Sequence, residues 1–158
     1  MKKISVLLIA LALSACSTTN SLVKKNDNFA KETKQQSYRI ETPNNQQEFE
    51  QYFTQQLNKQ LAKNKIKNDL TSNDTIITYE LDFDQGNRAL RYFVGFGAGK
   101  AQAIVKAHLI NKADGKEIAS LTTDARLSMG VFGGDAKATL DNAAVDITKK
   151  IVESNIFE

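Results

Sequence analysis

Very few side chains in this chain are of the types that usually do chemistry. His108 is the one histidine, and it falls on the polar side of an alternating segment, residues 101–111. Asp82, Asp84 and Asp124 occupy polar positions of neighbouring alternating segments. Together these four side chains could bind a metal or act as acid and base. A strand face turned to solvent also normally carries such charges, so both interpretations stay open, and the solvated face is the favoured one.

Other catalytic patterns are missing from the sequence. It contains no Gly-x-Ser-x-Gly nucleophile motif and no His-Glu-x-x-His metal motif. Residues 95–100, GFGAGK, have only three residues between the first glycine and Gly-Lys, and alanine follows. A phosphate-binding loop needs four residues there, followed by Ser or Thr at the start of a helix. We therefore expect tight bends at these glycines, no cofactor and no enzymatic activity.

The strongest chemical signal is Cys16. Lys2 and Lys3 precede an apolar run, Ile4 to Leu13, which is too short to span a bilayer and is typical of a secretory signal. The ending Leu13-Ser14-Ala15-Cys16 resembles the bacterial lipobox, which marks the cysteine for lipid attachment and for becoming the mature N-terminus. This motif predicts a signal peptide over residues 1–15 and a lipid bilayer as partner through acylated Cys16. A residue other than Asp at position 17 indicates the outer membrane in enteric-type bacteria.

Charge and cysteine content narrow the class further. Removing residues 1–15 leaves 143 residues (158 − 15), and 19 basic residues (21 − 2) against 18 acidic ones. No concentrated basic patch remains, which argues against nucleic acid as a partner. Because Cys16 is the only cysteine, the folded domain has no disulfide and no thiol ligand.

The chain divides into a polar tether and one globular domain. Residues 16–35 are polar, and we predict a tether that could reach ~60 Å when extended. Residues 36–158 form the predicted domain. Period-2 alternation predicts strands, and the apolar stripes at i, i+3 and i+4 predict helices. The predicted elements are a strand near 37–41, a helix over 44–64, strands over 75–84, 101–111 and 116–128, and a helix over 135–153.

This order, β-α-β-β-β-α, predicts an α+β fold. We expect a four-stranded sheet, mostly antiparallel and possibly mixed, with both helices on one face, because fully parallel strands are apolar on both sides.

Aromatic residues crowd into two glycine-containing connections. Two interpretations stay open for these residues: a surface that docks a partner protein, or a lid or hairpin extension that packs on the core. The residues concerned are Tyr92, Phe93, Phe96, Val131 and Phe132.

Three segments together resemble a known family. Residues 91–101 (RYFVGFGAGKA), Asp114-Gly115-Lys116 and residues 131–134 (VFGG) before the last helix are similar to the DUF4410 family of bacterial envelope lipoproteins. The resemblance covers roughly residues 36–155. The family has no established activity, so the resemblance implies an envelope location and no reaction.

We expect a lipoprotein anchored to the outer membrane and facing the periplasm, which acts as a non-catalytic binding or assembly module for an envelope protein. The alternatives are a small-molecule or lipid binder, with its apolar pocket between helices and sheet, and a carboxylate-dependent enzyme that uses the sheet face near His108.

Overall fold

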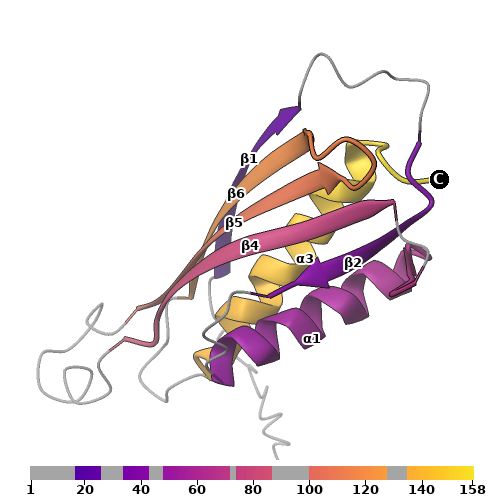
Figure 1. Cartoon of the computed structure of the whole chain (residues 1–158). Coiled ribbons are helices and arrows are strands. Elements are labelled where there is room, and N and C mark those ends of the chain that lie inside the picture. The colour runs from indigo at the N-terminus through magenta and orange to yellow at the C-terminus, as the bar shows by residue number, and fades with distance from the viewer. Residues whose placement is uncertain (1–16, 26–33, 43–47, 72–73, 87–99, 128–134) are drawn as a thin grey trace, which may run out of the picture.

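In the part of the chain that the structure describes, two helices lie along one face of a twisted six-stranded sheet, and no helix covers the other face (Figure 1). The computed structural model describes residues 17–25, 34–42, 48–71, 74–86, 100–127 and 135–158. The strand order is β1-β6-β5-β4-β2-β3. The prediction of an α+β fold is confirmed, but the sheet is mixed and has six strands where four were expected.

The parallel part of the sheet is a β-α-β unit. β2 (Ser37–Glu41) pairs in parallel with β4 (Thr75–Asp84), and α1 (Glu48–Lys63) makes the crossover between them. A parallel pair needs such a crossover, because its second strand must start at the same end as the first. The two-residue β3 (Lys67–Asn68) pairs in parallel with the outer side of β2.

The antiparallel part follows the predicted strands closely. β4 pairs with β5 (Ala101–Asn111), and β5 pairs with β6 (Glu117–Leu127). The turn between β5 and β6 places Gly115 at φ +68°, a conformation that glycine adopts without steric cost. The last helix, α3 (Lys137–Glu153), then returns along the same face of the sheet as α1.

Part of the predicted tether belongs to the fold. Residues 17–25 form strand β1 (Ser17–Lys25), which pairs antiparallel with β6 from Ser17 opposite Leu127 to Lys25 opposite Ala119. The tether prediction is therefore wrong for this segment. Its side chains are mostly polar, but the strand is held by backbone hydrogen bonds that any residue except proline can make.

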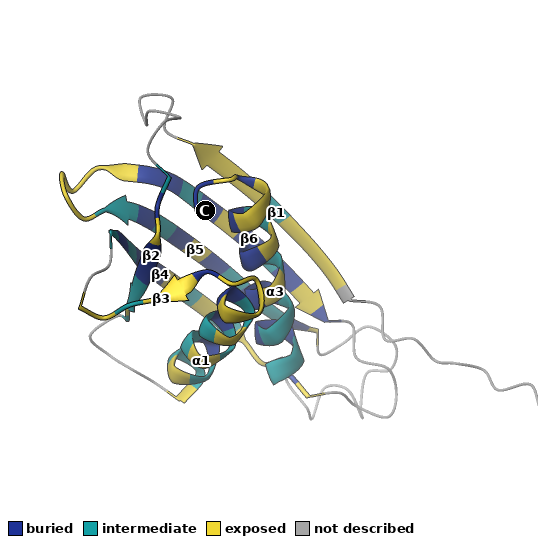
Figure 2. Cartoon of the chain, turned by 90° about the vertical axis from the view of Figure 1, so that its right-hand side faces the viewer, coloured by how far each residue is buried: buried dark blue, intermediate teal, exposed yellow. Residues whose placement is uncertain are grey.

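The core lies between the sheet and the helices. Figure 2 shows the buried positions concentrated where the helices face the strands. Helix α1 contributes Phe53, Leu57 and Leu61, all with no exposed area, as the predicted stripe requires. The Phe53 ring meets the Tyr79 ring edge-on at 5.0 Å.

Leu57→Ala tests this packing. We expect the free energy of unfolding to fall by ~2–5 kcal/mol, because the substitution removes buried methyl groups and leaves a cavity. Chemical denaturation of the soluble domain measures the change. Gln55→Ala, at an exposed position of the same helix, is the control and should stay within ~0.5 kcal/mol of the wild type.

Candidate functional site

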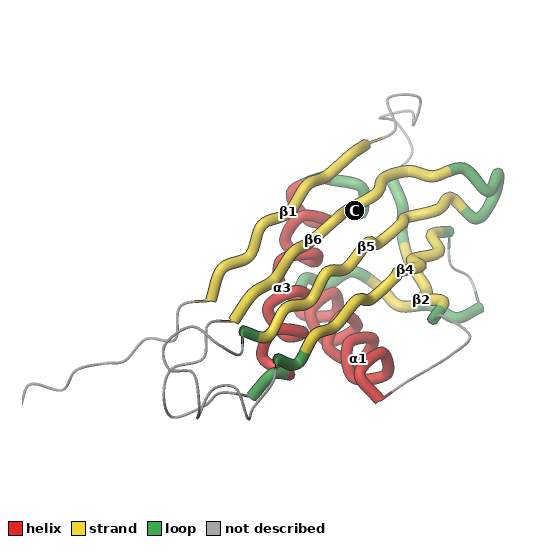
Figure 3. The backbone as a smooth tube through the Cα atoms, turned by 90° about the vertical axis from the view of Figure 1, so that its left-hand side faces the viewer, coloured by secondary structure: helices red, strands yellow, loops and turns green. Residues whose placement is uncertain are grey.

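The helix-free face of the sheet, which we call the open face, carries the polar side chains that the sequence singled out. Figure 3 views the sheet from this side, with the helices behind the strands. Alternation sends Ala103, Val105 and Ala107 to the buried side of β5 and leaves Lys106 and His108 on the open face. The polar side of this strand was therefore predicted correctly.

His108 does not join the three aspartates. It lies between Thr78 and Ser120 in the sheet register, and its Nδ1 is 2.6 Å from a carboxylate oxygen of Glu117. Asp82 and Asp124 lie on either side of Ile104, four residues along β5 from His108. At ~3.3 Å per residue this separation is ~13 Å along the strand.

Asp124 has its own partners on the open face. Arg126 donates to both of its carboxylate oxygens, at 2.6 and 3.1 Å, and the Gln102 amide donates at 2.9 Å. The hydrogen bonds from Arg126 hold the pKa of Asp124 below its usual value. Asp84 lies opposite Gln102. The carboxylate–histidine cluster that the sequence left open as an alternative is therefore not assembled. The described residues include no group of three or more His, Cys, Asp or Glu side chains that could hold a metal ion.

The two aromatic connections fall outside the described residues, and so do Tyr92, Phe93, Phe96, Val131 and Phe132. The strands that flank these connections end together. Ala101 at the start of β5 is opposite Leu127 at the end of β6, and Leu127 is also opposite Ser17 at the start of β1. We call the end of the sheet formed by Ser17, Ala101 and Leu127 the β1-start end.

Cys16 also lies outside the described residues, immediately before Ser17. Strand β1 thus begins at the residue that follows the predicted lipid attachment site. No helix in the described ranges has the length and apolar character needed to cross a membrane.

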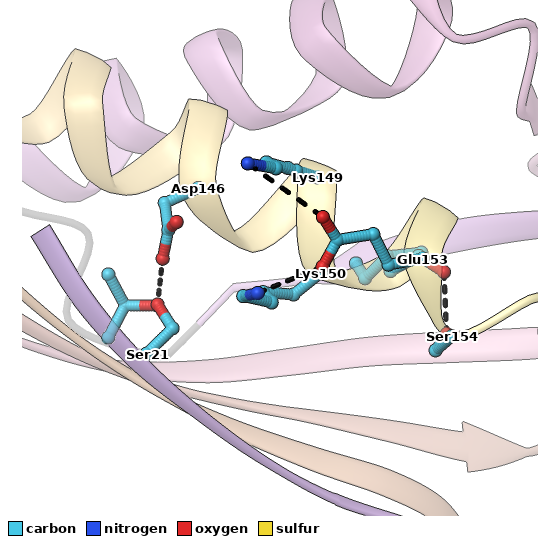
Figure 4. A network of polar contacts seen from close by, with 8 residues as sticks. Ser21, Asp146, Lys149, Lys150, Glu153 and Ser154 are labelled. Carbon is cyan, nitrogen blue, oxygen red and sulfur yellow. Dashed lines mark hydrogen bonds and ion pairs between the residues drawn. The ribbon is translucent and has the colours of Figure 1, made fainter.

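A polar network that the sequence did not indicate fixes β1 to α3 (Figure 4). The hydroxyls of Ser21 and Thr123 are 2.8 Å apart, and Thr123 donates to Asp146 on α3 at 3.5 Å. Lys25 donates to the backbone carbonyl of Ser154 at 2.6 Å. Thr123 is fully buried, on the face of β6 whose other side chains include Leu121 and Ala125. Its partner Ser21 lies in the segment that the sequence predicted to be a tether.

Burial raises the pKa of the Asp146 carboxyl. The nearby positive charge of Lys150 lowers it, but by less than burial raises it. An acid whose pKa is raised by folding binds more protons in the folded state, so stability falls as pH rises through the interval above its ordinary value of 3.8.

Asp146→Asn should therefore raise the free energy of unfolding at pH 7, since the amide oxygen can still accept from Thr123. The gain should shrink as pH is lowered towards 3.8, because the wild-type carboxyl takes up its proton over this interval. Denaturation curves between pH 3.5 and 7 give the comparison, with the exposed Asp82→Asn as the matched loss of one carboxylate. A gain that does not change with pH would contradict this explanation.

Three solved structures are compared with this chain. The chain is similar to the PelC dodecamer from Paraburkholderia phytofirmans, with a TM-score of 0.56 and 9% identity over 89% of this chain and 99% of that one. A PDZ domain protein from Parabacteroides distasonis gives 0.50 and 10% identity over 84% of this chain and 37% of that one. A minor lipoprotein from Acinetobacter baumannii gives 0.49 and 13% identity over 77% and 96%. At these identities the likeness concerns the fold alone.

A family model identifies the family to which this chain belongs. The model of the domain of unknown function DUF4410 matches residues 14–131, and the chain belongs to this family. The resemblance seen in the glycine-aromatic segment is thereby confirmed. A search of curated proteins found no match.

Proposed function

We propose that this protein is a lipoprotein of the bacterial envelope, anchored to the outer membrane through acylated Cys16 and facing the periplasm. Its role is that of a non-catalytic binding or assembly module. The observation that carries the proposal is the position of Cys16 between an apolar leader and the first residue of the folded sheet. A cysteine there can be acylated at the bilayer while the rest of the chain folds in water.

The open face supports a non-catalytic role. His108 is engaged by Glu117, Asp124 by Arg126 and Gln102, and Lys106 lies 3.8 Å from Glu80. Catalytic acids and bases usually converge in a concave pocket, where burial and like charges perturb their pKa values. Paired charges on an open sheet face are instead typical of a solvated surface.

The docking surface that we propose for the envelope partner consists of Tyr92, Phe93, Phe96, Val131 and Phe132. The two connections that hold these residues leave the sheet from neighbouring strand ends, which supports a common surface. Phe96→Ser with Phe132→Ser should abolish crosslinks to a partner in intact cells without changing thermal stability. Lost stability with unchanged crosslinks would assign these aromatic side chains to the core.

Separation of inner and outer membranes from cells grown with labelled palmitate tests the proposed anchor. We expect the label on the protein and the protein in the outer-membrane fraction. Protease added to intact cells should leave the protein uncut. The same protease should cut the protein once the outer membrane has been opened. Unlabelled protein in the soluble fraction would refute the proposal.

A further inference from the structure

We propose that the β1-start end of the domain rests directly on the bilayer, with no spacer between lipid and fold. This inference depends on the proposed acylation of Cys16 and adds the orientation in which the domain is held. The partner in this inference is the lipid surface, which would lie beside the docking surface proposed above for an envelope protein.

Covalent geometry keeps the lipid-bearing residue next to the folded sheet. Consecutive Cα atoms are 3.8 Å apart, so the lipid-bearing residue lies within one residue of Ser17. Ser17 is paired with Leu127, and the pairing continues without interruption to Lys25 opposite Ala119. Acyl chains that enter the bilayer from Cys16 must therefore bring the end of β6 to within a few ångströms of the lipid headgroups.

Strand β1 is attached to the rest of the domain by side-chain hydrogen bonds as well as by its backbone pairing. The middle and the last residue of β1 are tied to other elements: Ser21 reaches Thr123, and Lys25 reaches the carbonyl at the C-terminal end of α3. If the strand detached, these hydrogen bonds and the ladder with β6 would be lost together. The anchor consequently holds the whole domain and not a loose terminal segment.

The remaining elements define which parts of the domain lie at the β1-start end and which lie at the opposite end. Both helices start near the β1-start end: Lys137 at the start of α3 forms an ion pair of 2.9 Å with Glu48 at the start of α1. The opposite end holds the turn with Gly115 and the C-terminal residue Glu158, whose backbone donates to Gln35. With 11 residues in β5, the two ends are ~35 Å apart.

The consequence is a fixed orientation. The turn at residues 112–116 points away from the membrane, and the open face runs outward from it. A protein that docks at the β1-start end must itself lie at the membrane surface, whereas one that docks at the turn need not.

Single-cysteine labelling tests the orientation. Because acylation occupies the thiol of Cys16, one introduced cysteine gives a unique label. Lys100→Cys marks the β1-start end and Asp114→Cys marks the turn, and both positions are exposed. The full-length lipidated variants are placed in vesicles of phosphatidylethanolamine and phosphatidylglycerol with an acceptor dye on the headgroups. Energy transfer should be at least about twofold more efficient from position 100, because the two positions differ by ~35 Å along the strand.

Equal transfer from both positions would overturn the proposed orientation, since a domain on a free tether samples all orientations. Twelve Gly and Ser residues inserted after Ser17 provide the matched control: the variant keeps Cys16 and the residue after it, and the difference should disappear. Protein that carries no lipid and does not bind the vesicles would instead refute the proposed anchor, and the orientation with it. Transfer that is stronger from position 114 would place the opposite end on the membrane.

Discussion

Cys16→Ser is expected either to release the protein from membranes or to trap it as an uncleaved precursor. Without the thiol no diacylglyceryl group can be attached, and no helix among the described residues is long and apolar enough to cross a bilayer. The variant should appear either as soluble protein or as an uncleaved precursor, since lipidation precedes cleavage at a lipobox. Because one acyl chain binds membranes only marginally and stable anchoring needs two, loss of all chains should shift the partition of any cleaved protein from nearly all bound to nearly all free.

Fractionation after membrane separation, with immunoblotting of precursor and mature forms, measures this effect. Ser17→Ala is the matched control, because it keeps the cysteine, keeps a residue other than Asp after it and leaves the backbone pairing of β1 intact. The control should remain in the outer membrane. A Cys16→Ser protein that is cleaved and still partitions with membranes would show that the anchor is something other than the lipid.

A chain that starts at Gln35 is expected to be much less stable than one that starts at Ser17. The shorter chain lacks β1, so the backbone groups along one edge of β6 lose their partners, and Thr123 loses the hydroxyl of Ser21. We expect the thermal midpoint to fall by about 10 °C or more, as a loss of about 3 kcal/mol would produce in a domain of this size. The unpaired β6 edge should also promote aggregation.

Thermal unfolding and size-exclusion chromatography of the two soluble chains provide the measurement, since neither contains Cys16. Equal midpoints and equal elution as monomers would mean that β1 contributes nothing to the fold. That result would restore the tether interpretation of residues 17–25, and it would remove the basis for a fixed orientation on the bilayer.

The elements with strong periodicity could be predicted from the sequence. The apolar stripe of Phe53, Leu57 and Leu61 identified α1, because the other face of this helix carries mainly Gln, Asn and Lys and the contrast between the faces is clear. Alternation identified β4, β5 and β6 almost to the residue. In each case one face of the element is buried in the core, and burial selects the side chains.

Two features of the fold could not be predicted in this way. β1 lies at the sheet edge with few buried side chains, so its backbone pairing leaves little trace in the sequence. The parallel pairing of β2 and β4 was also hidden, because a short strand with one buried face has the same alternation in either direction.

The carboxylate–histidine cluster, which the sequence offered only as the less favoured alternative, does not form for a related reason. Alternation placed His108, Asp82 and Asp124 on the correct face, but a face extends over many rows of residues. The register, which alternation does not determine, separates them. The actual partner, Glu117, is nine residues away in the sequence, across the β5–β6 hairpin, next to an irregularity in pairing at Leu109 and Ile110.

The mass of the mature N-terminal peptide tests the central claim most directly. Intact protein is purified separately from the membrane and the aqueous fractions of bacterial cells and digested, and the first peptide is measured by mass spectrometry. We predict a peptide that begins at Cys16 and carries a diacylglyceryl group on sulfur and an acyl chain on nitrogen. A free thiol on Cys16 in protein recovered from the aqueous fraction would contradict the claim.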